Sequence, residues 1–280
     1  MTDYLDFNAD LANPEVAEAF DDLTYWSSMF GQFLFEHLHL APRLTALDVG
    51  CGTGFPLLEL ADRLGPTSTV YGIDAWDHAV ARARQKARVR GNTNVQVTHG
   101  DAADMPYDDS SFDLIVSNLG LNNFDNPTVV MAECRRVCAP AGRLALTTNL
   151  VGHMGEFYKI YEQTLVATGN SHRVDQLHRQ EAHRATPEGL HSLFSQAGFE
   201  VTVCHMETFT LRYSDGSAFL RAYLSRLGFL DGWKGVLGDT GQETAVFEEL
   251  EARLNRLSHE SSEGLCLSIP AAYFEGRRRR

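Results

Sequence analysis

Short apolar runs alternate with amphipathic stretches between residues 44 and 148. Each apolar run has the length of a buried strand, and each intervening stretch repeats its apolar residues at helical spacing. Such alternation over about a hundred residues predicts strand–helix–strand units, a parallel sheet and therefore an α/β fold. The predicted strands span residues 44–49, 68–73, 95–98, 112–117 and 143–148, and the predicted helices span residues 56–64, 77–90 and 127–137, with a turn at 140–142.

The residues before 44 and after 148 show a different pattern of apolar and polar positions. Residues 14–40 read as one helical stretch that Pro42 ends. After residue 148 the pattern predicts helical segments at 154–168, 187–197 and 216–260, a polar segment at 170–185, and strands at 200–212 and 264–269. These patterns predict an N-terminal helical cap (1–42) and a ligand-binding domain (43–280). Helical insertions near 151–185 and 213–262 are expected to form a lid.

The charge balance restricts the possible partners. Lys and Arg number 24 against 37 Asp and Glu, which gives a net charge of −13. Such a chain repels phosphate backbones, which argues against a nucleic-acid partner. No apolar run reaches the roughly 18 residues of a membrane span, and residues 1–4 lack the basic start of a secretory signal. Five widely spread cysteines then predict free thiols in the cytoplasm. The terminal run Arg277–Arg280 is expected to be a disordered end or a remnant of expression.

A glycine-rich turn, Asp48-Val49-Gly50-Cys51-Gly52-Thr53-Gly54, joins the first predicted strand to a helix. Its G-x-G-x-G spacing differs from the G-x-G-x-x-G of dinucleotide sites, and no Gly-Lys-Ser/Thr of a P-loop follows. Asp48 would oppose a pyrophosphate but would attract an ammonium or sulfonium group. The turn therefore predicts a nucleoside ligand with a cationic tail.

Two further carboxylates follow successive predicted strands. Asp74 ends the second strand, where its two oxygens could accept hydrogen bonds from both ribose hydroxyls. Asp101 follows the third strand, where it could accept from an adenine amino group. A single aspartate at a strand end is usually a turn or helix cap. Three of them at the carboxyl edge of a parallel sheet favour a ligand site.

Four motifs occur in order and carry a resemblance: Leu47–Gly54, Gly72-Ile73-Asp74, Gly100-Asp101-Ala102 with Met105-Pro106-Tyr107, and Phe112–Val116. Together they resemble the class I S-adenosylmethionine-dependent methyltransferases, in particular the small-molecule branch that includes the ubiquinone and menaquinone biosynthesis enzymes. The resemblance implies a Rossmann-like, seven-stranded, mostly parallel sheet with an antiparallel last strand, helices on both faces and a helical lid. It also implies methyl transfer from S-adenosylmethionine to a small-molecule acceptor, mainly by proximity and in-line alignment, with S-adenosylhomocysteine as product.

The resemblance also assigns cofactor roles to individual residues. The methionine moiety is expected against Asp48, Gly50 and Asn118, the ribose on Asp74, and the adenine beside Asp101 and Ala102. The full set of expected cofactor-binding residues is Asp48, Gly50, Cys51, Gly52, Gly54, Asp74, Ala75, Asp101, Ala102 and Asn118.

The acceptor is less defined. Asn122 and Asn123 stand near the place where many relatives of the quinone enzymes carry histidines, which argues against a quinone-type acceptor. Either turn formation or contact with the acceptor would account for this pair. Tyr25, Trp26 and Phe30, in the N-terminal segment, are expected to line the substrate pocket. His153 is the candidate base, although a histidine in a loop there need have no catalytic role.

A metal site is not predicted. The spacings of His172, His178 and His183 do not give the i, i+4 pair of a helical zinc site. Three alternative functions remain: a protein or nucleic-acid methyltransferase, a non-catalytic S-adenosylmethionine-binding subunit, and an NAD(P) oxidoreductase. Asp48 and the glycine spacing disfavour the last of these. The oligomeric state stays open.

Overall fold

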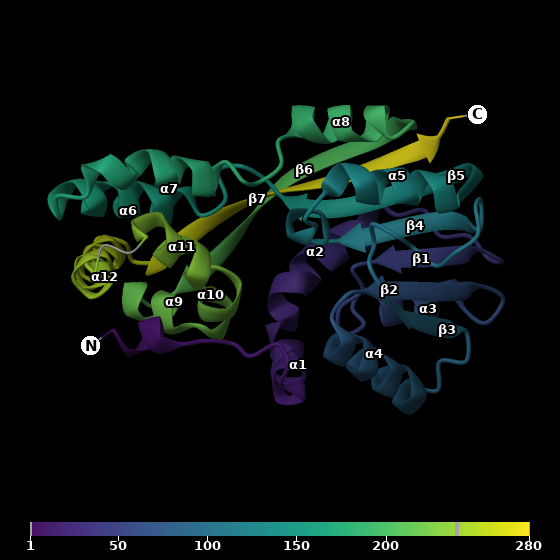
Figure 1. Ribbon diagram of the computed structural model, residues 1–280, viewed down its shortest axis with the longest axis horizontal. Coiled ribbons are helices and arrows are strands. Elements are labelled where there is room, and N and C mark those ends of the chain that lie inside the picture. Colours follow the sequence, from purple (N-terminus) through teal and green to yellow (C-terminus); the bar gives the residue numbers. More distant parts are fainter. Residues whose placement is uncertain (1, 239–240, 280) are drawn as a thin grey trace. The chain divides into compact units, whose positions relative to one another are not determined.

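The computed structural model describes residues 2–238 and 241–279, and Figure 1 shows their secondary structure. The chain forms two compact units. We call residues Asp10–Thr148, Ala185–Glu207 and Ala271–Arg280 the sheet unit, and residues Met1–Ala9, Asn149–Arg184 and Thr208–Pro270 the helical unit. The predicted cap thus divides after residue 9, and the predicted insertions fall in the helical unit except for Ala185.

A seven-stranded sheet has the order β3-β2-β1-β4-β5-β7-β6. Its strands are β1 (Thr45–Val49), β2 (Thr69–Asp74), β3 (Val95–His99), β4 (Phe112–Asn118), β5 (Cys138–Asn149), β6 (Phe199–Tyr213) and β7 (Leu265–Arg278). The pairs β1·β2, β1·β4, β2·β3 and β4·β5 are parallel. The predicted Rossmann-like α/β class with a mostly parallel sheet is confirmed.

Strand β7 runs against β5. Arg278, at the end of β7, donates to the carbonyl oxygen of Cys138 at the start of β5, while Glu275 pairs with Arg143 further along. In Figure 1 the arrowhead of β7 points opposite to those of β1 and β4. The last strand is therefore antiparallel, as the resemblance implied.

The sheet unit also carries helices, several of which begin at a capping side chain. These are α1 (Pro14–Phe20), a 3₁₀ turn at Asp21–Leu23, α2 (Thr24–His37), α3 (Leu57–Leu64), α4 (Asp77–Arg90), a 3₁₀ turn at Leu121–Asn123, α5 (Pro127–Val137) and α8 (Pro187–Gln196). Asn13, Asn126 and Thr186 each accept a backbone N–H at a helix start, and a proline follows each of them.

Helices cover both faces of the sheet. Phe33 of α2 contacts Tyr273, and Phe194 of α8 contacts Phe274, with ring centroids 6.3 and 5.9 Å apart. Tyr273 and Phe274 are neighbours in β7, so their side chains point to opposite faces. Helices α2 and α8 therefore lie on opposite sides of the sheet.

Two elements differ from the prediction because tertiary contacts override local pattern. The single predicted helix over 14–40 is interrupted at Asp21–Leu23. The predicted turn at 140–142 lies inside β5, because Cys138 already pairs with Phe112 and the register then shifts before Arg143 pairs with Leu114. Ala141, with φ of 63°, accommodates the extra residues as a bulge within one long strand.

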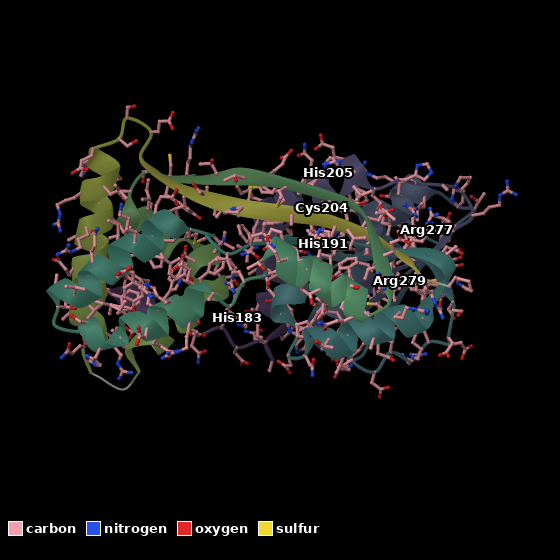
Figure 2. The ribbon with its side chains drawn as sticks, turned by 90° about the horizontal axis from the view of Figure 1, so that it is seen from above. His183, His191, Cys204, His205, Arg277 and Arg279 are labelled. Atoms are coloured by element: carbon pink, nitrogen blue, oxygen red, sulfur yellow. The ribbon has the colours of Figure 1, made fainter. Side chains whose placement is uncertain are left out.

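The terminal arginines are ordered, so the prediction of a disordered end is wrong for residues 277–279 (Figure 2). Arg277 and Arg278 belong to β7, and Arg278 also donates to the hydroxyl oxygen of Ser110 at 2.8 Å. The backbone N–H of Arg279 donates to Gly198 at 3.0 Å. Arg280 lies outside the described residues.

The helical unit is built around buried aromatic side chains. Its helices are a 3₁₀ turn at Asp3–Asp6, α6 (Gly155–Ala167), a 3₁₀ turn at Ser171–Arg173, α7 (Val174–Glu181), α9 (Gly216–Arg221), α10 (Tyr223–Gly228), α11 (Leu230–Leu237) and α12 (Glu243–His259). Phe157, Phe219 and Trp233 pack together, with ring centroids 4.3 to 5.5 Å apart. Within the part of the chain that the structure describes, no helix is long and apolar enough to span a membrane.

Glycine at position 72 allows β2 to approach the start of α3. A Cβ atom there would lie 2.7 Å from Cδ2 of Leu57 and 2.9 Å from Sγ of Cys51. We expect Gly72→Ala to lower the free energy of unfolding by about 1–3 kcal/mol in urea denaturation, because the added methyl overpacks this contact.

The matched control is Gly235→Ala, where a Cβ in α11 would meet no atom within 4 Å. This change should not lower the free energy of unfolding and should raise it by up to about 1 kcal/mol, because alanine has the higher helix propensity. Equal stabilities for the two variants would contradict the close approach at Gly72.

Candidate functional site

The carboxyl ends of adjacent parallel strands bring predicted site residues together. In the register of β1 and β2, Asp48 lies opposite Gly72 and Val49 opposite Ile73. Asp74 ends β2 and lies opposite His99 at the end of β3, and Asp101 follows two residues later. Asp48, Asp74 and Asp101 therefore follow one edge of the sheet, as their order in the sequence predicted.

The glycine turn depends on backbone conformations that favour glycine. Gly50, Gly52 and Gly54 have φ angles of 77°, 50° and 105°. The N–H groups of Gly50 and Cys51 both donate to the carbonyl oxygen of Ile73, at 2.9 and 3.1 Å. A Cβ on Gly52 would meet no atom within 4 Å, so this part of the turn leaves room for a ligand to approach the backbone.

Asp74 connects the end of β2 to the glycine turn. Its Oδ2 atom accepts from the Gly52 N–H at 2.8 Å, and its Oδ1 atom accepts from the Trp76 N–H at 2.8 Å. Each carboxylate oxygen can accept more than one hydrogen bond. Asp74 is half-buried, so it can fix the turn and still accept from ligand hydroxyls.

Asp48 is a carboxylate without a compensating partner. It is 0% exposed, and neither of its oxygens has a hydrogen-bonding partner among the residues that the structure describes. Burial and the negative charge of Asp74 raise its pKa from 3.8 to about 8. The nearby backbone N–H of Leu57 at the start of α3 opposes this shift only in part, because its geometry falls short of a hydrogen bond. The carboxyl group is therefore largely protonated at neutral pH, and a ligand cation beside it would favour the ionised form.

The other expected cofactor residues have defined surroundings. Asp101 is exposed, and its Oδ1 atom accepts from the Ala103 N–H at 2.8 Å in a local turn. The Ala75 carbonyl oxygen accepts from the His99 ring at 3.0 Å, and Ala102 is half-buried. Cys51 is buried, and burial raises the pKa of its thiol well above the ordinary value. Its contribution is therefore packing rather than thiolate chemistry.

The predicted asparagines make structural hydrogen bonds. Asn118 donates to the Ser27 carbonyl oxygen at 3.1 Å and accepts from the Thr147 hydroxyl at 2.8 Å, so it connects β4 to α2 and β5. Asn122 donates to the Thr148 hydroxyl at 2.8 Å, and Asn123 donates to the Leu119 carbonyl oxygen at 3.1 Å. Contact of these side chains with cofactor or acceptor stays a prediction.

The three aromatic residues expected in the substrate pocket differ in exposure. Phe30 is fully buried, with its ring 5.1 Å from that of the half-buried Trp26. Tyr25 is 64% exposed. The half-buried Trp26 therefore offers part of its ring to solvent, and the buried Phe30 packs against the other part. Their contact with an acceptor also stays a prediction.

Asp21, whose role the sequence did not reveal, attaches the N-terminal helices to α4. It accepts from Arg82 at 2.7 Å and Lys86 at 2.8 Å, both on α4. Burial alone would raise the pKa of Asp21, but the hydrogen bonds from Lys86, Thr53 and Arg82 lower it below the ordinary value. The basic face of α4 was visible in the sequence, but its partner lies some 60 residues away.

Trp76 was not predicted either. Its indole N–H donates to the Leu11 carbonyl oxygen at 2.8 Å, and its ring meets Phe20 edge to face at 5.6 Å. The sequence did offer one indication of this role, because Trp76 directly follows the predicted cofactor residues Asp74 and Ala75. With Asp21, it holds residues 10–23 against the loop that follows β2.

His153 lies in the helical unit, in contrast to the expected cofactor residues. It is 1% exposed, with its ring 5.3 Å from that of Phe229. Burial and the charge of Arg184 lower its pKa to about 3, so it is neutral at pH 7. Its role as a base stays a prediction. Across residues 2–238 and 241–279, no three His, Cys, Asp or Glu side chains gather in a metal-binding arrangement.

Comparison with known proteins supports the fold and identifies the family. The sequence model of a family described as "Methyltransferase domain" matches residues 40–198. The demethylmenaquinone methyltransferase of Geobacillus stearothermophilus is 39% identical over 97 residues, which are 35% of this chain and 42% of that protein. The enzyme of that name from Anoxybacillus flavithermus is 31% identical over 163 residues, 55% of this chain and 69% of that protein. The chain thus spans less than half the length of the first relative.

Similarity in structure extends further along the chain. YcgJ from Bacillus subtilis superimposes with a TM-score of 0.59 over 90% of this chain and 99% of its own. Its sequence identity is 16%, so this match concerns the fold alone.

The raised pKa of Asp48 has a consequence for stability. The folded state retains a proton that the unfolded state loses near pH 4, so Asp48 lowers the free energy of unfolding as pH rises from about 4 to 8. Asp48→Asn removes this titration while keeping the shape of the side chain. We expect the variant to gain stability relative to the wild type between pH 5 and pH 8, measured by urea denaturation. A stability difference that is the same at both pH values would contradict the assignment.

Proposed function

This chain belongs to the methyltransferase-domain family, and from that premise we propose that it transfers a methyl group from S-adenosylmethionine to a small-molecule acceptor. The observation that carries the proposal is the buried, unpartnered carboxylate of Asp48 beneath an open glycine turn. The ionised form of this carboxyl repels a pyrophosphate, and a bound cation stabilises that ionised form. Family membership and local electrostatics therefore favour the same ligand.

The residues at this edge of the sheet fit such a cofactor. Asp74 offers acceptor oxygens to ribose hydroxyls, and Asp48 offers a negative charge to the cationic amino-acid portion. Asp101, in an exposed turn, offers an acceptor to the adenine amino group. S-adenosylmethionine would supply a methyl group on a positively charged sulfur, which leaves as the neutral sulfide of S-adenosylhomocysteine. The protein then contributes position and exclusion of water.

The acceptor is proposed to be a small molecule. The demethylmenaquinone methyltransferases are named for small-molecule chemistry, and the net charge of −13 disfavours a nucleic acid. Asn122 and Asn123 stand where many quinone-related enzymes carry histidines, so we do not extend the quinone acceptor to this chain. If the acceptor carries an ionisable proton, His153 is the proposed base. It is neutral at pH 7, but its pKa of about 3 makes it a weak proton acceptor until its surroundings change.

The cofactor proposal is tested by thermal unfolding with S-adenosylmethionine, S-adenosylhomocysteine and NAD. At about 100 times its dissociation constant, a ligand stabilises the folded state by about 2.7 kcal/mol. The first two ligands should raise Tm and NAD should not. Stabilisation by NAD alone would overturn the proposal, and cofactor binding without turnover of any acceptor would indicate a non-catalytic subunit.

Asp74→Ala should abolish most of this ligand-induced shift, because it removes the acceptor for the ribose hydroxyls. The matched control is Asp77→Ala, which makes the same charge change at an exposed position in the first turn of α4. The control should keep the shift. Tm of each variant without ligand reports any structural loss from the missing Gly52 and Trp76 hydrogen bonds. A full shift in Asp74→Ala would refute the ribose assignment.

Binding of S-adenosylmethionine should also release a proton. At pH 7 the carboxyl of Asp48 is largely protonated, and a cation beside it lowers its pKa. Isothermal titration calorimetry in buffers of different ionisation enthalpy should report close to one proton released by the wild type. Asp48→Asn should release none from this position. Equal proton release by the two proteins would show that Asp48 does not contact the cationic portion.

A further inference from the structure

Strand β6 forms one edge of the seven-stranded sheet, and β3 forms the other. Strand β6 is 15 residues long, from Phe199 to Tyr213, whereas β3 has five residues. Cys204 and His205, which are labelled in Figure 2, belong to β6. On its outer side β6 has no neighbouring strand among the described residues, so it offers a row of backbone N–H and C=O groups to a further strand.

The edge at β3 is blocked by a side chain, in contrast to the edge at β6. The Asn94 carbonyl oxygen accepts from Val70 in β2, so the Val97 carbonyl, three residues later, points to the outer side. Arg84 of α4 donates to that carbonyl oxygen from Nε and Nη2, at 2.9 and 2.7 Å. In β6, no described side chain donates to a backbone carbonyl of residues 200–208, and the strand contains no proline, lysine or glycine. The edge at β6 therefore lacks these common protections against pairing.

One face of β6 is open to solvent. The even-numbered side chains point to that face, and all of them are exposed except the half-buried Cys204. Met206, in the middle of the strand, is 59% exposed. At the ends of the opposite face, Phe199 and Leu211 are buried. An exposed apolar side chain thus lies at the centre of an unprotected strand, an arrangement that favours pairing with another strand.

The residues of β6 are arranged almost symmetrically about Met206. Positions at equal distance before and after it carry side chains of matching kind or of opposite charge. When two copies of β6 pair antiparallel about a two-fold axis at Met206, such positions lie directly opposite each other on the same face. The opposed residues are His205 with Glu207, Cys204 with Thr208, Val203 with Phe209, Thr202 with Thr210, Val201 with Leu211, Glu200 with Arg212, and Phe199 with Tyr213. A second copy of this strand is therefore a complementary partner for β6.

The charged residues favour this register over its neighbours. It places Glu200 opposite Arg212 of the second copy, and the two-fold axis repeats this ion pair at the other end. An axis one residue earlier or later would lose both ion pairs, and the later one would put Glu207 opposite its own copy. Within the chain, Arg212 contacts Glu263 at 3.4 Å, with side-chain exposures of 62% and 61%. Such an exposed pair contributes little, so Arg212 can exchange this partner for Glu200 of the second copy.

We propose that β6 is a homodimer interface, at which two copies of this chain pair antiparallel about Met206 and extend the sheet from one copy into the other. The register depends on β6 alone, because every opposed pair consists of two residues of that strand. The expected cofactor residues lie outside β6, so the interface is independent of the proposed methyl transfer.

Sedimentation velocity of the full chain over a range of concentrations tests the interface. The wild type should dimerise. Glu200→Arg and Arg212→Glu should each raise the dissociation constant of the dimer about tenfold or more, because each puts two pairs of like charges opposite each other. The double variant should recover most of the wild-type affinity, since both ion pairs are restored with reversed sign.

The matched control is Glu248→Arg, an equal charge change at an exposed position of α12 that has no ion pair among the described residues. It should leave dimerisation unchanged. A wild type that stays monomeric overturns the inference and would leave the edge to a strand of a different protein. Single variants that dimerise as the wild type does, or a double variant that does not recover, also overturn it. Circular dichroism and Tm identify a variant that fails to fold, and disulfide cross-linking then decides.

Disulfide cross-linking tests the register directly. Opposite residues of antiparallel strands have Cα atoms about 4.5–5.5 Å apart, which is within reach of a disulfide. Cys204 and Cys266 are the cysteines that are not buried, so the background is Cys204→Ser with Cys266→Ser. In it, Met206→Cys oxidised with diamide should give a covalent dimer on non-reducing electrophoresis.

Thr202→Cys in the same background is the control for the cross-link. Position 202 lies opposite position 210 of the second copy, which puts it about 27 Å from its own copy along the strand. It should therefore give no covalent dimer. A covalent dimer with Thr202→Cys, or none with Met206→Cys, would refute the proposed interface.

Discussion

The site depends on a carboxylate buried where it has no partner. Asp48 lies in the central part of the sheet, beneath a turn whose N–H groups bond to β2 and to Asp74 rather than to Asp48. The free energy of burying this group is unfavourable in the absence of a ligand, and protonation relieves only part of it. A buried carboxyl group of this kind is suited to binding a cation. The other residues at the carboxyl edge of the sheet would hold the rest of the same ligand.

The glycine turn and the N-terminal segment form one connected arrangement around that carboxylate. Asp74 fixes the turn through Gly52, and Asp21 holds the N-terminal helices to α4. These contacts are hydrogen bonds between groups distant in sequence, so the turn keeps its shape without a ligand. A preformed turn lowers the entropic cost of binding.

The two units contribute different chemistry. The sheet unit carries the acids and glycines expected to hold a nucleoside, whereas the helical unit carries buried aromatic rings and a histidine that is neutral at pH 7. Parallel sheets offer ligand sites at their carboxyl edge whatever the reaction. The chain departs furthest from the alternating strand–helix pattern in the helical unit.

The sequence by itself determined the α/β class, the bounds of α4 and α5 and the order of Asp48, Asp74 and Asp101, because periodicity and strand-end spacing are local properties. It failed at residues 138–142, where pairing with β4 turned a predicted turn into a bulge, and at residues 277–279, where β7 ordered the terminal arginines. Only the tertiary structure decided that Asp21 pairs with α4 and that Asn118 is held by Ser27 and Thr147. Each of these depends on which distant groups meet, and local sequence carries no information about that.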